Sequence, residues 1–314
     1  MFLALLEAMR PGQWTKNLFV FAGVIFARKL AEPAAVIESI AAFGLFCLLS
    51  SAVYLINDVV DAEKDRAHPT KRTRPIASHR LSIPVATAAA VGLAALSIGG
   101  SFALPPTFAA LALIYPQEVG RLWQGIQLPP TFAALALIYL ALNLAYSFRL
   151  KHIVILDVLC IAMFFVLRAA AGAAAIQVAI SHWLLICTVL IALFIALSKR
   201  RHELVLLTDN ARNHRASLGE YSPYLLDQMI AVVTASTLMA YILYTVDART
   251  VSQFGSDRLA YTIPFVIFGI FRYLYLVHQK GEGGNPDRII VSDRQFLVNI
   301  VLWAVAVGLT IYLR

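Results

Sequence analysis

The sequence predicts an all-helical membrane protein, with about nine transmembrane helices in a single domain over residues 1–314. Three observations predict this fold class. Hydrophobic residues make up 60% of the chain and charged residues only 14%, and the mean hydropathy is +0.75. Apolar runs of about 20 residues, long enough to cross a hydrocarbon core, alternate with short polar segments. Lys and Arg gather in alternate connections between these runs.

The apolar runs place the nine helices in order along the chain. We expect them at residues 15–31, 35–57, 83–104, 128–148, 153–177, 181–198, 225–246, 260–278 and 295–313. The first run gives the weakest signal, because Arg28 and Lys29 shorten its apolar part.

Positive charge sets the expected orientation. With a cytoplasmic N-terminus, 18 of the 26 Lys and Arg residues fall on the cytoplasmic side, as the positive-inside rule requires. We therefore expect a protein embedded in membrane lipids, with its N-terminus and its most basic connections in the cytoplasm. The net charge of +8 lies in connections between spans, so nucleic acid is not an expected partner.

A twelve-residue stretch occurs twice. Residues 104–115 and 128–139 are identical, letter for letter. Solenoid proteins repeat several diverged units, so we interpret 104–127 as a local duplication or insertion and give it no function.

An acidic motif follows the second apolar run. If that helix continues past Asn57, then Asp58, Asp61 and Asp65 lie on one face, with Asn57 beside Asp61. Hard oxygen ligands suit Mg²⁺, which takes one or two carboxylates together with substrate phosphate. The sequence thus predicts a magnesium site for a diphosphate, with the three aspartates as catalytic residues and metal ligands and with Asn57 as a further metal ligand and substrate contact. The alternative is a solvated loop with incidental acids.

Cations follow the acids directly. Pro69 and Pro75 bracket Lys71, Arg72 and Arg74. Arg forks match phosphate oxygens, so we expect these three residues to bind substrate. The alternative is that they only set the orientation of the chain in the membrane.

Two further clusters and an N-terminal segment are candidate substrate contacts. The junction before the fifth helix and that helix itself contribute Tyr146, Lys151, Asp157 and Arg168, and the end of the sixth helix contributes Lys199, Arg200, His202 and Glu203. Ionisable groups within a span line a cavity or pair with each other, so the alternatives for the first cluster are a structural Asp157–Arg168 pair or a snorkelling Arg168. For the second cluster the alternative is that its cations only set the orientation of the chain in the membrane. Near the N-terminus, Lys16 is a candidate, whereas Arg10 and Trp14 are interpreted as interfacial anchors. Arg272 has no predicted role.

The motif Asn57-Asp58-x-x-Asp61-x-x-x-Asp65, followed by a basic loop, resembles the first acidic motif of the UbiA superfamily of intramembrane prenyltransferases. The resemblance extends over the whole apolar chain and implies a UbiA-type bundle in the bacterial inner (plasma) membrane, with its active-site loops at the cytoplasmic side. Aromatic prenyltransferases of that superfamily carry a second acidic motif after the sixth helix. This chain has mostly cations there, at 199–203.

The remaining motifs resemble the decaprenyl-phosphate phosphoribosyltransferase branch of that superfamily. They occur in the branch's order at 10–17, 51–77, 150–152, 167–172 and 199–204. This resemblance implies Mg²⁺-dependent transfer of 5-phosphoribosyl from phosphoribosyl diphosphate (PRPP) to a polyprenyl (decaprenyl) phosphate for cell-envelope glycolipid synthesis. The alternatives are prenyl transfer to an aromatic acceptor, and a transporter or lipid-binding protein without chemistry. Polyprenyl length and oligomeric state, a homo-oligomer included, stay open.

Overall fold

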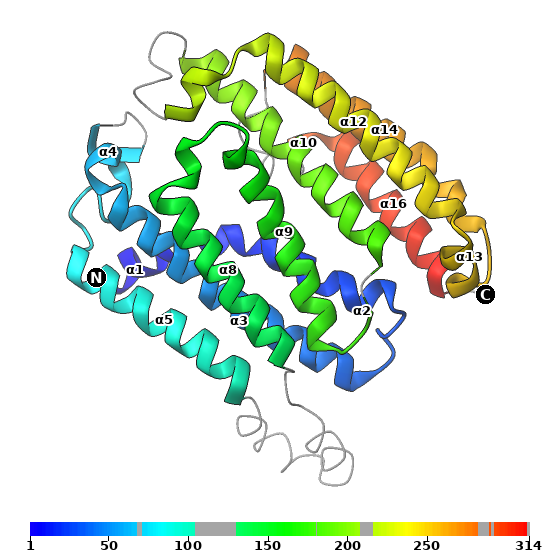
Figure 1. Cartoon of the computed structure of the whole chain (residues 1–314), viewed down its shortest axis with the longest axis horizontal. Coiled ribbons are helices and arrows are strands. Elements are labelled where there is room, and N and C mark those ends of the chain that lie inside the picture. The colour runs from blue at the N-terminus through cyan, green and yellow to red at the C-terminus, as the bar shows by residue number, and fades with distance from the viewer. Residues whose placement is uncertain are drawn as a thin grey trace. The chain divides into compact units, whose positions relative to one another are not determined.

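The computed structural model describes residues 1–67, 71–103, 130–179, 181–207, 216–281, 289 and 292–312. The first copy of the duplicated stretch, residues 116–127 and Pro69 lie outside these described residues. Within them the regular elements are all helices (Figure 1). The chain divides into two compact units, one of Met1–Leu150 and Phe164–Ile180, the other of Lys151–Met163 and Ser181–Arg314.

The first unit is built around α3 (Pro33–Val60), which packs against α5 (Ile83–Ala103) and α8 (Pro130–Phe148). Its smaller elements are α1 (Phe2–Met9), the 3₁₀ helix η1 (Pro11–Phe21), α2 (Ala22–Phe26), α4 (Ala62–Ala67) and the 3₁₀ turn η2 (Lys71–Thr73). The 3₁₀ turn η3 (Leu150–His152) and α9 (Leu156–Ala175) each contribute residues to both units.

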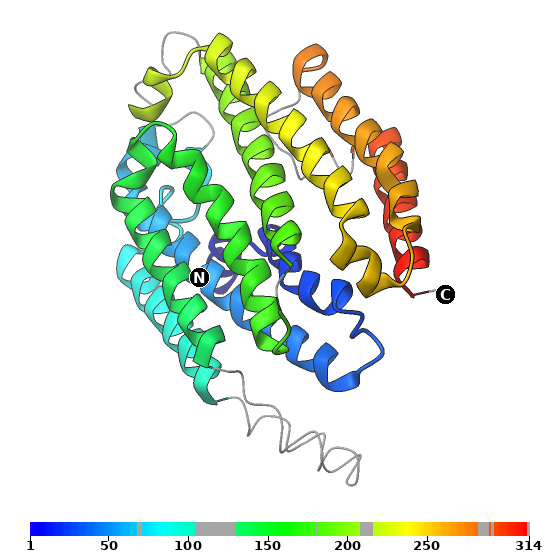
Figure 2. The same cartoon turned by 45° about the vertical axis from the view of Figure 1, so that its right-hand side comes forward.

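The second unit contains α10 (His182–Leu207) packed on α12 (Pro223–Val246), and α14 (Ile263–Gln279) packed on both α12 and α16 (Arg294–Tyr312). Figure 2 shows α12 in yellow, α14 in orange and α16 in red. Short elements connect them: η5 (Ala216–Glu220), α13 (Ala248–Phe254) and η6 (Arg258–Thr262).

Eight of the predicted apolar runs correspond to helices that are long and apolar enough to cross a membrane, among the residues described. Their ends agree with the predicted ranges to within a few residues, apart from one. The helix predicted at 181–198 continues to Leu207, so Lys199–Glu203 lie inside α10 and not in a loop. The protein is therefore an integral membrane protein made of helices.

The predicted helix over 15–31 is wrong as a continuous α-helix, because η1 and the five-residue α2 occupy that range. These elements nevertheless run antiparallel to α3. Trp14 donates to Ser51, and Val24, further along, packs against Ala35 near the other end of α3. Eleven 3₁₀ residues and five α-helical ones extend about 30 Å, similar to the hydrocarbon thickness. Nine crossings stay a prediction.

The 3₁₀ geometry of η1 fits its contacts. With three residues per turn, side chains at i and i+3 eclipse, so Trp14, Asn17 and Val20 form one row. Asn17 and Val20 are fully buried, and Asn17 donates to Cys47 Sγ and Ser50 Oγ. The backbone of η1 also approaches α9 closely, since a Cβ added to Gly172 would lie 1.8 Å from the carbonyl oxygen of Val20.

Candidate functional site

The acidic motif lies at the junction of α3 and α4. Asp58 is in the last turn of α3, and Asp61 is the C-cap that follows the helix, with φ −94° and ψ 5°. A second short helix then carries Asp65, whose backbone N–H donates to the carbonyl of Asp61 at 2.8 Å. The continuous helical face assumed over 57–65 is therefore interrupted at Asp61. Asp58 and Asp65 are 2% and 4% exposed, whereas Asp61 is half-buried.

Two arginines bind the buried aspartates. Arg74 Nη1 lies 3.2 Å from Asp58 Oδ1 and 2.6 Å from Asp65 Oδ2, so it bridges the two carboxylates. Arg10 also donates to Asp58 Oδ1 and lies over the ring of Tyr54, 5.1 Å from its centroid. Glu7, in the last turn of α1 before Arg10, instead forms an exposed pair with Arg80, and that hydrogen bond holds the pKa of Glu7 below its ordinary value.

Arg10 is the residue of this cluster that sequence reasoning missed. The sequence predicts an interfacial anchor at Arg10 because Trp14, an aromatic residue typical of membrane interfaces, lies close to it. The residue has a positive φ of 54° between α1 and η1, a conformation that is uncommon outside glycine. The motif at residues 10–17, to which Arg10 belongs, is the sequence feature that could have identified it as a site residue. Of the predicted basic residues, Arg74 reaches the acids, while Lys71 is half-buried and Arg72 is exposed on η2.

Asn57 is held from α8. Its side-chain oxygen accepts a hydrogen bond from the buried Ser147, whose hydroxyl also lies 2.7 Å from the carbonyl of Asn143. Ser147 was not among the predicted site residues, since nothing in a single sequence relates positions 57 and 147. Its neighbour Tyr146 was predicted to bind substrate; it is half-buried and packs edge-on against Phe164 at 5.6 Å.

Arg168 lies inside a span and is 4% exposed. Its guanidinium donates to Asn17 Oδ1 at 2.8 Å, to Tyr139 Oη at 2.8 Å and to the carbonyl of Phe164 at 3.0 Å. These acceptors are all neutral. The cation therefore joins η1, α8 and α9 within the first unit. Lys16, next to Asn17 on η1, is half-buried.

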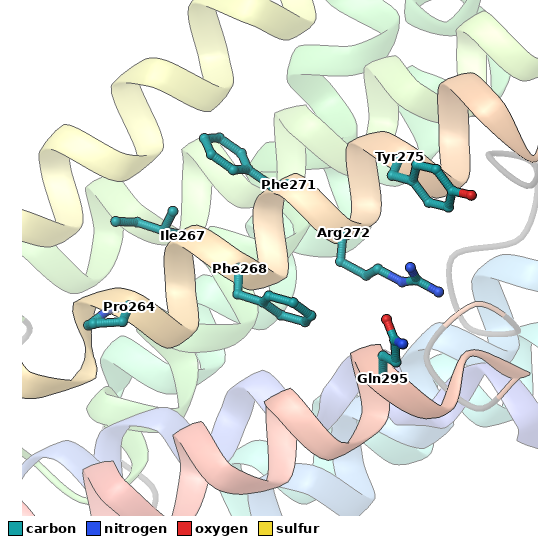
Figure 3. A pocket seen from close by; sticks show the side chains of 7 residues that line it. All are labelled: Pro264, Ile267, Phe268, Phe271, Arg272, Tyr275 and Gln295. Atoms are coloured by element: carbon teal, nitrogen blue, oxygen red, sulfur yellow. The ribbon is translucent and has the colours of Figure 1, made fainter.

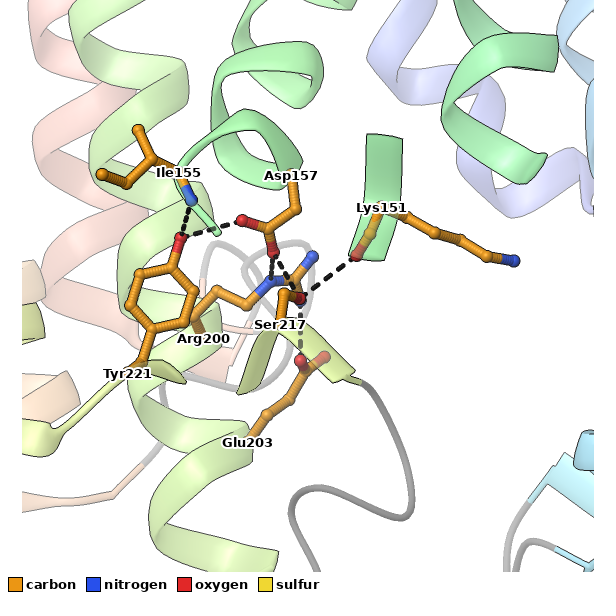
Figure 4. A network of polar contacts seen from close by, with 7 residues as sticks. All are labelled: Lys151, Ile155, Asp157, Arg200, Glu203, Ser217 and Tyr221. Atoms are coloured by element: carbon orange, nitrogen blue, oxygen red, sulfur yellow. Dashed lines mark hydrogen bonds and ion pairs between the residues drawn. The ribbon is translucent and has the colours of Figure 1, made fainter. Parts of the chain in front are cut away.

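A second buried carboxylate lies at the start of α9, in the second unit (Figure 4). Asp157 is fully buried and accepts from Arg200 Nε at 2.8 Å and from Tyr221 Oη at 2.8 Å. Ser217 Oγ lies 3.3 Å from the same carboxylate. Burial raises the pKa of the Tyr221 phenol, which keeps it protonated and able to donate.

Arg200 completes this network. It is 2% exposed, and its Nη1 lies 2.6 Å from Glu203 Oε2 one turn further along α10. The alternative Asp157–Arg168 pair is not formed, because Asp157 pairs with Arg200. Lys199 and His202 are half-buried on the same helix. The Lys151 side chain points away from Asp157, although its carbonyl accepts from Ser217 (Figure 4).

A model of the UbiA prenyltransferase family matches residues 17–115. A decaprenyl-phosphate phosphoribosyltransferase of Corynebacterium glutamicum is 34% identical to this chain over 315 residues, covering 98% of this chain and 87% of that protein. The chain belongs to the UbiA prenyltransferase family. A protein of the same name from Mycolicibacterium smegmatis is 32% identical, covering 98% of this chain and 92% of that protein. This UbiA-family chain is a transferase.

The UbiA fold is also found among solved structures. A UbiA homolog from Archaeoglobus fulgidus, bound to GPP and Mg²⁺, superimposes with a TM-score of 0.68 at 16% identity, covering 98% of this chain and 99% of that one. At that identity the similarity establishes the fold alone. The all-helical membrane architecture predicted from the sequence is therefore confirmed.

The acidic cluster of this UbiA-family chain has a donor set that suits a divalent cation. Over the described part of the chain, no three His, Cys, Asp or Glu side chains form a ready metal site. Two carboxylates suffice for Mg²⁺, however, because it retains water and substrate phosphate as further ligands. Asp58 Oδ2 is buried and has no hydrogen-bond partner among the described residues. Such an atom is costly to bury without a partner, so it fits the role of a metal ligand.

Arg272, which had no predicted role, pairs with Asp293 at 2.7 Å in the second unit. This hydrogen bond holds the pKa of Asp293 below its ordinary value. Arg272 also borders a pocket of about 360 Å³ between α14 and α16, with Phe268, Tyr275 and Gln295 (Figure 3).

The Asp157 network gives a testable prediction for stability. Replacing Asp157 by asparagine should lower the free energy of unfolding by about 2–3 kcal/mol, because the buried Arg200 loses its fully buried counterion and keeps only the partly exposed Glu203. Thermal unfolding of the detergent-solubilised protein measures the effect. Asp227→Asn is the matched control, since Asp227 pairs with Arg201 but is 35% exposed, and should cost less than about 1 kcal/mol. Equal losses for the two variants would contradict the prediction.

Proposed function

We propose that this chain transfers a 5-phosphoribosyl group from PRPP to a polyprenyl phosphate, expected to be decaprenyl phosphate, and releases pyrophosphate. The observation that carries the proposal is the similarity, over nearly the whole chain, to relatives named decaprenyl-phosphate phosphoribosyltransferase. The buried acidic pair beside two arginines supports it, because a diphosphate leaving group needs both a metal site and cations.

The bond changes are simple. An oxygen of the lipid phosphate forms a bond to the anomeric carbon of the ribose, and the bond from that carbon to the diphosphate oxygen breaks. The diphosphate leaves with the electron pair. The lipid phosphate is already ionised near neutral pH, so the chain needs no strong general base. Positioning of the two anionic substrates then supplies much of the rate.

The acidic cluster would serve the leaving group. Asp58 and Asp65, with Asn57 and Asp61 beside them, would hold Mg²⁺, which when bound neutralises charge on the departing diphosphate. Arg74, with Lys71 and Arg72, would bind the donor's phosphates, since guanidinium forks match phosphate oxygens. Ser147 would orient Asn57 through the hydrogen bond between their side chains.

The other predicted residues receive separate roles. Lys16 and Lys151 would bind the lipid phosphate, and Arg168 would position Lys16 by holding its neighbour Asn17. Tyr146 would line the path of the lipid. In α10, Lys199, His202 and Glu203 would contact the donor's phosphate or ribose, while Arg200 and Asp157 would hold that helix in register. We further propose a bacterial plasma-membrane location with a cytoplasmic N-terminus, from the positive charge distribution.

An assay with the purified protein tests the function. PRPP and polyprenyl phosphates of several lengths are incubated with Mg²⁺ or with a chelator, and pyrophosphate and the lipid product are measured. We expect both products in equal amounts and only with metal. Geranyl diphosphate with an aromatic acceptor is the parallel donor. Pyrophosphate from that reaction alone would indicate prenyl transfer, and substrate binding without turnover would indicate a binding protein or transporter.

A further inference from the structure

The two buried carboxylates of the acidic cluster already have cationic partners. Asp58 and Asp65 pair with the guanidiniums of Arg10 and Arg74, while Asp61 beside them is half-buried. Asp58 Oδ1 accepts from both arginines, whereas Asp58 Oδ2 is buried without a hydrogen-bond partner among the described residues. A divalent cation bound to Asp58 Oδ2 would bring two further positive charges within a few ångströms of both guanidiniums.

Such an arrangement is electrostatically unfavourable. Like charges a few ångströms apart in a partly buried site repel strongly, because the surroundings screen them less than water does. Either the cation binds weakly or one arginine leaves its carboxylate. Arg74 is held by two carboxylates, whereas the ion pair of Arg10 within the described residues is with Asp58 alone. The side chain of Arg10 is also 28% exposed, so it can move without being stripped of solvent contact.

We propose that Arg10 is a ligand-binding residue that pairs with Asp58 until metal and diphosphate bind together, and that its guanidinium then moves from the carboxylate to the diphosphate. This inference rests on the proposed function, since it takes a metal-bound diphosphate as the ligand. Arg10 therefore weakens the binding of Mg²⁺ when diphosphate is absent, and strengthens the binding of Mg²⁺ and diphosphate together. As a result, the site binds Mg²⁺ poorly on its own, and the two ligands bind with positive cooperativity.

The proposal predicts effects of opposite sign in one variant. Arg10→Gln should tighten binding of Mg²⁺ alone about tenfold, because the competing cation is gone. The same change should weaken binding of pyrophosphate at saturating Mg²⁺ about tenfold, because a charge-assisted phosphate contact is lost. Titration calorimetry of the full-length protein in detergent measures both constants. A merely structural role would weaken both, and that result, or an unchanged Mg²⁺ affinity, would overturn the proposal.

Two further variants keep the test decisive. Arg80→Gln removes an arginine from an exposed ion pair in the same unit and should change neither constant. Arg10→Lys retains the charge without the fork, so Mg²⁺ alone should bind as in the parent while pyrophosphate binds more weakly. If Arg10→Gln fails to fold, an Arg10→Lys protein with parental pyrophosphate affinity would refute the inference. Because pyrophosphate is released from PRPP and from prenyl diphosphates alike, these results are independent of which donor the enzyme uses.

Discussion

Replacing Asp58 by asparagine is expected to reduce the proposed phosphoribosyl transfer by about a thousandfold while the protein remains folded. The substitution keeps the shape of the side chain but removes the negative charge. An amide is a poor substitute for a carboxylate as a magnesium ligand. Arg10 and Arg74 have side chains 28% and 29% exposed, so both can turn toward water when their shared counterion is lost. Initial rates with PRPP and a polyprenyl phosphate, together with a melting curve, measure the two effects.

Glu63→Gln is the matched control for Asp58→Asn. Glu63 belongs to the same acidic segment but is exposed on α4, and its replacement should leave the rate within about twofold of the parent, as for surface substitutions away from a site. Asp58→Asn protein with parental activity and parental melting temperature would exclude Asp58 from the catalytic residues. Equal losses for Asp58→Asn and Glu63→Gln would instead indicate a general effect of charge in this segment.

Replacing Gly172 by alanine should cost about 3 kcal/mol or more of unfolding free energy, the upper range for overpacking. The added Cβ would lie 1.8 Å from the carbonyl oxygen of Val20 and 2.6 Å from its carbonyl carbon. Both atoms are backbone, so no side chain can rotate away. Alanine is favoured over glycine in a helix by about 1 kcal/mol, which is too little to offset the overlap. Thermal unfolding in detergent and the yield of membrane-inserted protein measure the loss.

Gly44→Ala, in the same unit, is the matched control and is not expected to destabilise the protein. Gly44 lies inside α3, and nothing stands within 4 Å of the position that its Cβ would take. This change should therefore be neutral or stabilise the protein by up to about 1 kcal/mol. If Gly172→Ala melted at the same temperature as Gly44→Ala, the close approach of η1 to α9 would be wrong.

Hydropathy predicted eight spans well because a hydrocarbon core selects for length and apolar composition, and both are visible in a sequence. Hydropathy was wrong in two places, the helix type over residues 15–31 and the C-terminal end of α10, where specific side-chain contacts determine the backbone conformation. At the N-terminus, Trp14, Asn17 and Val20 repeat with a period of three, and a search for 3₁₀ geometry could have found that spacing. In α10, the helix continues through Lys199–Glu203 because Arg200 has Asp157 as a buried partner, which a hydropathy profile does not contain.

The acidic motif and Arg74 could be proposed from local spacing, since they lie within twenty residues of one another. Arg10, Ser147 and Tyr221 could not, because each acts on a residue 48 to 90 positions away. The same limit explains the Asp157–Arg168 alternative. Because both residues lie on one predicted helix, the sequence suggested an ion pair between them. In the structure each residue instead has a partner from an element that is distant in the sequence.

Arg168 also bears on how the protein is made. An arginine near the middle of a span opposes membrane insertion by about 2.5–3.5 kcal/mol. Two of its hydrogen-bond acceptors, Asn17 and Tyr139, precede it in the chain. Synthesis runs from the N-terminus, so both are made before α9 leaves the ribosome. The third acceptor, the Phe164 carbonyl, lies one turn earlier on α9 itself. The order of the helices thus provides acceptors for this charge at the moment of insertion, and loss of Asn17 would act first on biogenesis.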